Sequence, residues 1–220
     1  MAARSTIRRW RHGSAPSGDV FYGDFARDYE KRVSAQPLWA AQQAVFERLI
    51  EALPAGSSVL DVPFGTGRFA DAYRRAGLEV LGLDSSPDMV AEARRLYPEA
   101  MAAFRIEIGD ATKLPFDDTS VDTVVCTRFL AGTVSFSTAK QVLAEFHRVV
   151  RSTALLDLGS RAESSRATWP PRDSEPMQNR ADRTELRAFL EESGFAVREI
   201  VTCSEHRGGI RLAVVCDRID

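Results

Sequence analysis

The stretch Val59-Leu60-Asp61-Val62-Pro63-Phe64-Gly65-Thr66-Gly67 decides the fold, because it joins an apolar strand to a glycine-rich turn. Gly65 and Gly67 permit backbone conformations that other residues avoid, so the chain can turn tightly and approach a ligand closely. A helix is expected over about residues 68–76, and its N-terminus would face the same turn. The stretch therefore predicts a strand–loop–helix unit with a ligand site at the loop.

Similar units follow along the chain. Strands are expected at 58–62, 79–83, 104–108, 121–126 and 153–158, with helices at 87–97 and 138–150 between them. Short connections between alternating strands and helices predict a parallel sheet with helices on both faces. After a helix at 184–193, two strand-like runs at 196–203 and 210–216 predict an antiparallel hairpin. The predicted fold class is α/β, a Rossmann-like doubly wound sheet that is mostly parallel and ends in an antiparallel C-terminal hairpin.

Three regions are expected from the composition along the chain. Residues 1–19 are predicted to be a disordered basic tail, because Met1 to Gly18 hold four arginines and no acid. Residues 20–56 are predicted to form N-terminal helices, at 24–32 and 37–53, that cap the ligand site. Residues 57–220 are predicted to be the Rossmann-like core. Within the core, the polar stretch 160–183 is long enough to suggest a lid or a substrate loop.

The overall composition excludes several classes of protein. A hydrophobic fraction of 44% and a charged fraction of 27% are typical of a globular domain, and the net charge of −2 gives no electrostatic reason to bind nucleic acid or an anionic membrane. No apolar run approaches the ~20 residues that span a bilayer. The three cysteines lack metal-ligand spacing, so no metal site is expected, and the chain is predicted to be cytoplasmic.

Acidic residues end three of the predicted strands, at Asp61, Asp84 and Asp110. Ligands of open α/β sheets bind outside the carboxyl ends of the strands, so these side chains are expected to surround one site. Asp84 lies 17 residues after Gly67, where it can accept hydrogen bonds from a ribose. A dinucleotide would place its pyrophosphate beside Asp61 and be repelled. S-adenosyl-L-methionine (S-adenosylmethionine) presents an ammonium and a sulfonium there, so the acids favour it over a nicotinamide dinucleotide.

Four ordered motifs carry a family resemblance. They are residues 59–67, the segment Leu81-Gly82-Leu83-Asp84-Ser85-Ser86-Pro87-Asp88-Met89, the segment Gly109-Asp110-Ala111 with 114–118 and 121–122, and the helix 144–150. Together these motifs resemble the class I S-adenosylmethionine-dependent methyltransferases, with the ubiquinone/menaquinone C-methylase-like (type 11) subgroup closest by pattern. The resemblance covers about residues 57–160. It implies methyl transfer to a small-molecule acceptor by in-line displacement, with release of S-adenosylhomocysteine.

The resemblance and the strand ends together give a set of candidate site residues. Asp61 is expected near the ammonium, Asp84 at the ribose, Asp110 with Ala111 at the adenine, and Tyr29 with Arg32 at the methionine carboxylate. The predicted cofactor-binding residues are Tyr29, Arg32, Asp61, Phe64, Gly65, Thr66, Gly67, Asp84, Ser85, Met89, Gly109, Asp110, Ala111 and Thr127. The acceptor-side candidates are Arg128, Phe129 and His206. No catalytic base is identified, and alignment with desolvation can carry methyl transfer without one.

Two departures and several alternatives remain open at this point. Pro63 stands where the family usually has glycine and donates no N–H, although cofactor binding is expected to survive. The family's Pro-Gly-Gly turn before the fifth strand is missing, which is read as a structural difference. The alternatives are an RNA or other nucleic-acid methyltransferase that uses the basic tail, a non-catalytic cofactor binder, and a nicotinamide oxidoreductase. The expected partner is a small-molecule acceptor, and the expected state is a monomer or a homodimer.

Overall fold

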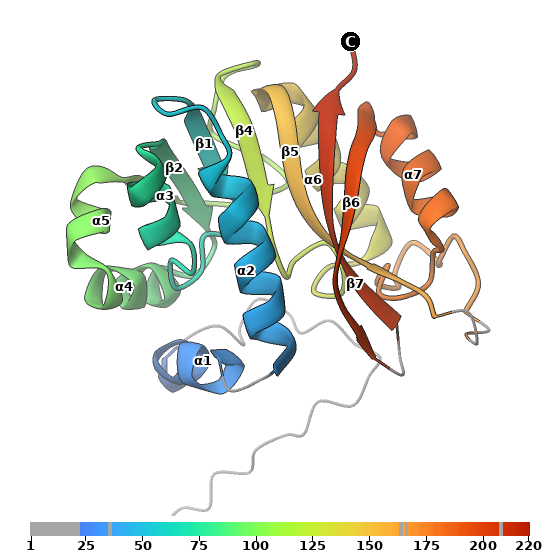
Figure 1. Cartoon of the computed structure of the whole chain (residues 1–220), viewed down its shortest axis with the longest axis horizontal. Helices are drawn as coiled ribbons and strands as arrows, with labels where there is room; N and C mark the ends of the chain where they lie inside the picture. Colours follow the sequence, from blue (N-terminus) through green and yellow to red (C-terminus); the bar gives the residue numbers. More distant parts are fainter. Residues whose placement is uncertain (1–22, 35–36, 163–164, 166, 207–208) are drawn as a thin grey trace, which may run out of the picture.

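The computed structural model describes residues 23–34, 37–162, 165, 167–206 and 209–220, which form one seven-stranded sheet with helices packed against it (Figure 1). The predicted tail, residues 1–19, lies outside the described residues. The strands are β1 (Ser58–Asp61), β2 (Glu79–Asp84), β3 (Arg105–Ile108), β4 (Val121–Cys126), β5 (Val150–Ser160), β6 (Phe195–His206) and β7 (Gly209–Arg218). The helices are α1 (Asp24–Ser34), α2 (Pro37–Glu51), α3 (Ala70–Ala76), α4 (Pro87–Leu96), α5 (Pro98–Ala103), α6 (Phe136–Val149) and α7 (Arg183–Glu192).

The order of the strands confirms the predicted fold class. Across the sheet the order is β3-β2-β1-β4-β5-β7-β6. The first five of these pair in parallel, whereas β7 is antiparallel to both of its neighbours, and its arrow points the opposite way in Figure 1. The chain builds outward from β1 to β3 and then returns to place β4 on the other side of β1. This reversal creates a crevice at the carboxyl ends of β1 and β4, which is where ligands of such sheets bind.

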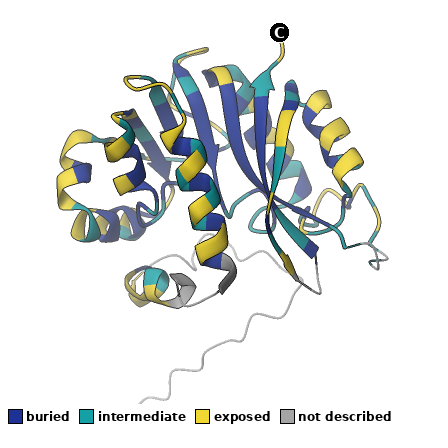
Figure 2. Cartoon of the chain, in the orientation of Figure 1, coloured by how far each residue is buried: buried dark blue, intermediate teal, exposed yellow. Residues whose placement is uncertain are grey.

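Two apolar cores hold the helices against opposite faces of the sheet, and the strands between them are mostly buried (Figure 2). One core contains Phe46 and Ile50 of α2 together with residues of α3 and α4. The other contains residues of α6 and α7, among them Phe146 and Phe189. Phe46 and Ile50 are both fully buried, so α2 belongs to the packed core of the protein.

The described part of the stretch 160–183 is packed against the core. The ring of Trp169 lies 5.4 Å from that of Phe136 and 5.5 Å from that of Phe189, measured between centroids. Met177 is buried, and the Glu175 carbonyl accepts a hydrogen bond from the Phe136 N–H at 2.7 Å. This part of the stretch therefore lies beside the residues that follow β4, and its role as a lid or substrate loop stays a prediction.

Several boundaries differ from those expected. The short helix α5 was not predicted, and β5 begins at Val150, immediately after α6 ends at Val149. The hairpin strands are also longer than expected, because β6 runs to His206 and β7 starts at Gly209. Over the described part of the chain, none of the helices combines the length and the apolar character that crossing a membrane requires.

Candidate functional site

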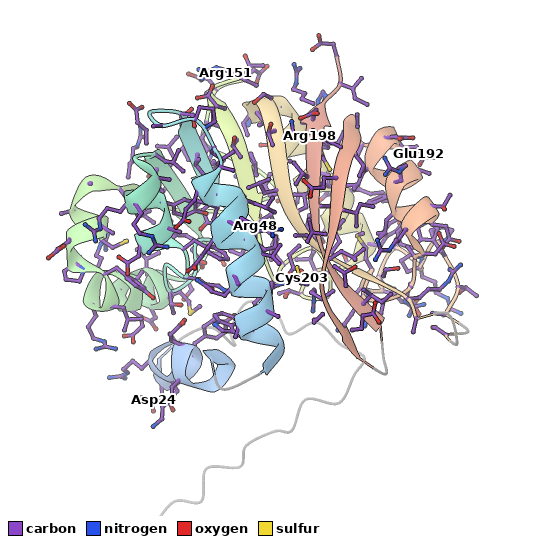
Figure 3. All side chains as sticks on the ribbon, viewed as in Figure 1. Asp24, Arg48, Arg151, Glu192, Arg198 and Cys203 are labelled. Carbon is purple, nitrogen blue, oxygen red and sulfur yellow. The ribbon has the colours of Figure 1, made fainter. Side chains whose placement is uncertain are left out.

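A cavity of about 220 Å³ lies at the carboxyl ends of β1, β2 and β4. Its wall is built from the loops that follow these three strands, with Tyr29 of α1 and Trp39 of α2 added from the N-terminal helices. Figure 3 labels Asp24 of α1 at this end of the sheet and Arg151 at the opposite end. Ten predicted site residues line the cavity: Tyr29, Phe64, Gly65, Thr66, Asp84, Ser85, Met89, Thr127, Arg128 and Phe129.

The glycine loop after β1 has the backbone that its sequence predicts. Gly65 and Gly67 have φ angles of 59° and 78°, in the left-handed region that favours glycine. A Cβ on Gly67 would also come within 3.3 Å of Ala93, Phe64 and Tyr97. Pro63, the departure from the family pattern, follows a cis peptide bond and lines the cavity.

Asp84, at the end of β2, ties the two neighbouring loops together. Its Oδ2 accepts the Gly65 N–H at 2.7 Å, and its Oδ1 accepts the Ser86 N–H at 2.8 Å. The residue is 6% exposed. Burial raises the pKa of Asp84, whereas the two N–H donors oppose that rise. Each carboxylate oxygen keeps a further lone pair, so the side chain can still accept hydrogen bonds from a bound diol.

Asp61, at the end of β1, is not among the residues that line the cavity. It is 2% exposed, and its Oδ1 has no hydrogen-bond partner among the described residues. Burial raises the pKa of Asp61 well above its usual value, the nearby Tyr73 hydroxyl lowers it, and the charge of Asp84 raises it again. A buried carboxylate with an unpartnered oxygen is costly alone and is stabilised by a cation.

The predicted adenine-binding residues lie beside the cavity and not in its wall. Asp110 is exposed, and its Oδ1 accepts the Thr112 N–H at 2.8 Å. The Gly109 N–H donates to the Asp84 carbonyl at 3.0 Å, which links this loop to the end of β2. Ala111 is buried below the loop. Of the three acids, therefore, Asp84 lines the cavity, whereas Asp61 and Asp110 are not among its lining residues.

The N-terminal segment that contains α1 contacts the glycine loop and the first turn of α4. The Thr66 hydroxyl donates to Oε2 of Glu30 at 3.0 Å, and the Gly23 N–H donates to Oδ2 of Asp88 at 2.7 Å. Tyr29 lines the cavity from the same helix. The side chains of Arg32 and His206, both predicted site residues, lie outside the described part of the structure.

Sequence reasoning missed Trp39, Arg68, Thr133 and Val134, which also line the cavity. Arg68 follows Gly67 directly, so its position next to the glycine loop could have been predicted from the sequence. Trp39 reaches the cavity only because α2 packs across the sheet, and no local pattern encodes that placement. Over the described residues, no group of three or more His, Cys, Asp or Glu side chains could hold a metal ion.

These features fit S-adenosylmethionine better than a dinucleotide. Asp84 offers free lone pairs for a ribose, and the Asp61 oxygen without a partner suits a nearby positive charge. A pyrophosphate at the glycine loop would be repelled by an ionised Asp61.

Comparison with known proteins agrees with this chemistry. Residues 59–153 match a family described as a methyltransferase domain. A malonyl-[acyl-carrier protein] O-methyltransferase of Pectobacterium atrosepticum is 38% identical over 146 residues, which cover 63% of this chain and 54% of that protein. A demethylmenaquinone methyltransferase of Renibacterium salmoninarum is 35% identical over 155 residues, which cover 69% of this chain and 60% of that protein. The chain thus spans little more than half the length of these relatives.

A solved structure supports the fold. The magnesium protoporphyrin IX methyltransferase of Synechocystis PCC 6803, crystallised with S-adenosylmethionine, has a TM-score of 0.67 at 17% identity, covering 91% of this chain and 94% of that one. These comparisons favour neither the nucleic-acid alternative nor the non-catalytic one, and the relatives named are methyltransferases rather than nicotinamide oxidoreductases. Residues 59–153 therefore match a methyltransferase domain, and the chain resembles S-adenosylmethionine-dependent methyltransferases in sequence and in fold.

Proposed function

We propose that this protein transfers a methyl group from S-adenosylmethionine to a small-molecule acceptor and releases S-adenosylhomocysteine. The observation that carries the proposal is Asp84, a buried carboxylate that faces the cavity and holds the glycine loop through the Gly65 N–H. S-adenosylmethionine supplies an electrophilic methyl group on a sulfonium. The chain has to bind the cofactor, align the acceptor with that methyl group and exclude water.

Most of the cofactor is assigned to the loops after β1, β2 and β3. In this proposal Asp84 binds the ribose hydroxyls, Asp61 offsets the positive charge of the methionine portion, and Tyr29 with Arg32 contacts its carboxylate. The cavity of about 220 Å³ is smaller than the roughly 300–1,000 Å³ of most ligand pockets. We therefore place the adenine beyond the cavity, beside Asp110 and Ala111, where the exposed Asp110 carboxylate is accessible.

The acceptor is assigned to the end of the cavity formed by the loop after β4. Arg128 and Phe129 line this end. His147, the one histidine with a described side chain, is bonded through Nε2 to the Ile219 carbonyl at 2.7 Å, next to the C-terminal end of β7. Proton removal is therefore not assigned to His147, and His206 stays an acceptor-side candidate from the sequence. The proposal relies on an acceptor atom that is nucleophilic once it is bound.

Other parts of the proposal come from composition and packing. The chain carries a formal charge of −2, which supports a small-molecule acceptor over a nucleic acid. The contacts of Glu30 with Thr66 and of Gly23 with Asp88 support a capping role for the N-terminal helices. A cytoplasmic location and a monomeric or homodimeric state remain predictions from the sequence.

Titration calorimetry with two ligands tests the proposal. We expect S-adenosylhomocysteine to bind the protein and NAD⁺ to give no heat of binding, because an ionised Asp61 repels a pyrophosphate. Binding of NAD⁺ but not of S-adenosylhomocysteine would contradict the proposal. If S-adenosylhomocysteine binds but methyl-labelled S-adenosylmethionine transfers no label across a broad acceptor panel, the protein is a non-catalytic binder.

A further inference from the structure

Two arginine side chains meet the ring of Trp39 at the wall of the cavity. The guanidinium carbon of Arg68 lies 3.6 Å from the centroid of the Trp39 ring, and that of Arg128 lies 5.0 Å from the same centroid. All three residues line the cavity. Positive charge is therefore concentrated beside an aromatic face, next to the loop after β4.

Neither guanidinium forms a salt bridge with a carboxylate within the described part of the chain. Arg68 donates instead to neutral oxygens, namely the side-chain oxygens of Gln42 and Gln43 and the Trp39 carbonyl. Burial and, second, the positive charge of Arg128 lower the pKa of Arg68 to about 10, although the negative charges of Asp157 and Glu30 offset part of this effect. Two like charges in a partly desolvated cavity are unfavourable together, and a bound anion would offset both.

The backbone of Arg128 is held in a conformation that non-glycine residues seldom adopt. Its φ angle is 57°, in the left-handed region, which is strained for a residue with a Cβ. Its N–H donates to Oδ2 of Asp157 at 2.8 Å, and its carbonyl accepts from the Thr133 hydroxyl at 2.8 Å. Asp157 is fully buried on β5, and its Oδ1 lies 3.4 Å from Nη1 of Arg211. The strained backbone of Arg128 is therefore held by hydrogen bonds on its N–H and on its carbonyl. Strained residues held in this way at a cavity are commonly part of a binding site.

We infer that the acceptor carries an anionic group (a carboxylate, phosphate or enolate) that Arg128 binds beside Trp39. Arg68 contributes positive charge to this site, and Asp157 acts as a positioning residue for Arg128. This inference rests on the proposed function, since it names the chemical class of the acceptor. An arginine fork matches the geometry of such anions, and the Trp39 face suits a planar ligand.

The methionine carboxylate of the cofactor has the same chemistry as the inferred group. We assign Arg128 to the acceptor because it belongs to the loop after β4. The glycine loop and the loop after β2 are joined to each other through Asp84, and Arg128 is part of neither. The two sources of an anion can be separated by saturating the protein with S-adenosylhomocysteine before any probe is added.

The test measures binding of benzoate, phenyl phosphate and neutral benzamide to the protein saturated with S-adenosylhomocysteine. We expect at least one anion to bind about tenfold or more tightly than benzamide, as one charge-assisted contact provides. Arg128→Gly should abolish this preference and leave the affinity for S-adenosylhomocysteine within about threefold, because glycine accepts a φ of 57° without strain. Arg151→Gln, which changes an arginine at the opposite end of the sheet, should keep the preference.

The positioning role of Asp157 has a separate readout. Asp157→Asn keeps an oxygen that accepts the Arg128 N–H and should keep the preference for anions, whereas Asp157→Ala should lose it. If Asp157→Ala does not fold, Thr133→Val can be tested in its place. This variant removes the hydrogen bond to the Arg128 carbonyl and should weaken the preference for anions over benzamide. If Asp157→Ala, or Thr133→Val when it is used instead, keeps the full preference for anions, the positioning role of Asp157 is overturned.

The remaining outcomes are equally decisive. Equal binding of benzamide and the anions, or no detectable binding of either anion, would overturn the inference while the proposed function stands. Anions that bind only when S-adenosylhomocysteine is absent, and compete with it, would assign the arginines to the cofactor carboxylate. Failure of S-adenosylhomocysteine to bind the unmodified protein would instead contradict the proposed function itself.

Discussion

The backbone N–H of Gly65 donates to Oδ2 of Asp84 at 2.7 Å, so the carboxylate that ends β2 holds the glycine loop that ends β1. The other oxygen of Asp84 holds the Ser86 N–H, at the residue that caps α4. One side chain therefore fixes the two loops that form most of the predicted cofactor site. A ligand that bonds to Asp84 would meet a loop that is already in place, which lowers the entropic cost of binding.

Asp61→Asn is predicted to stabilise the protein without ligand at neutral pH. Burial raises the folded-state pKa of Asp61 above its unfolded value, so the native state binds the proton more tightly than the unfolded chain. Stability should therefore fall as the pH rises from about 4 through the raised pKa. The asparagine variant should lack this fall and, at pH 7, gain about 1 kcal/mol or more in the free energy of unfolding by urea.

Asp122→Asn provides a control of opposite sign. The backbone N–H of Ser58 lowers the pKa of Asp122, followed by the Ser58 hydroxyl, so its ionised form stabilises the folded state above the unfolded pKa. This variant should lose stability at pH 7. An Asp61→Asn variant that is less stable than the unmodified protein at pH 7 would contradict the account of Asp61 as a destabilising buried charge.

Substitutions at Arg128 should separate backbone strain from side-chain contacts. Arg128→Ala retains the left-handed φ of 57° with a Cβ, whereas Arg128→Gly removes that strain. We expect the glycine variant to be more stable than the alanine variant by about 1 kcal/mol, measured by urea unfolding. This order reverses the usual one, since glycine normally destabilises ordered structure relative to alanine. An alanine variant as stable as the glycine variant would show that the backbone at this position is not strained.

Gly82→Ala is predicted to destabilise the protein and to weaken cofactor binding. A Cβ on Gly82 would lie 2.6 Å from Cδ2 of Phe64 and 2.7 Å from Cδ1 of Ile106. Phe64 would have to move, and it lines the cavity. Overpacking of this kind costs about 1–3 kcal/mol, so thermal unfolding and titration with S-adenosylhomocysteine should both report a loss.

Gly132→Ala is the matched control for this overpacking. The three atoms nearest to a Cβ on Gly132 all belong to the side chain of Gln178, and the closest lies 3.0 Å away. A glutamine side chain can rotate aside, so we expect a change in the free energy of unfolding within about 0.5 kcal/mol. Equal losses of unfolding free energy in Gly82→Ala and Gly132→Ala would contradict the idea that rigid packing around Phe64 causes the destabilisation.

Much of the fold could be predicted because its signals are local. The run from Val59 to Gly67 encodes a strand and its turn, and β4 was predicted at the residues the structure assigns to it. The helix α5 was missed because six residues between Tyr97 and Phe104 are too few to show a helical period. The C-terminal end of β5 was missed because Gly159 and Ser160 pair with β7, which is distant in the sequence. The end of β6 was missed because residues 204–206 continue the pairing across the hairpin with residues 209–211 of β7.

The site was predictable where residues follow a strand directly. Asp84 and Arg128 lie at or just after strand ends, and the structure brings both to the cavity. The roles of Asp61 and Asp110 at the cofactor stay predictions, because Asp61 is buried, Asp110 is exposed, and neither is among the residues that line the cavity. Trp39 could not be predicted, since its position depends on how α2 packs across the sheet.

Calorimetric titration of S-adenosylhomocysteine into Asp84→Asn tests the central claim most directly. Asp122→Asn is the control, because Asp122 also accepts a backbone N–H but belongs to the end of β4 opposite the cavity. We expect Asp84→Asn to bind at least about tenfold more weakly, from the loss of charge-assisted hydrogen bonds, and Asp122→Asn to bind like the unmodified protein. Unchanged affinity in a folded Asp84→Asn variant would contradict the assignment of this cavity to the cofactor.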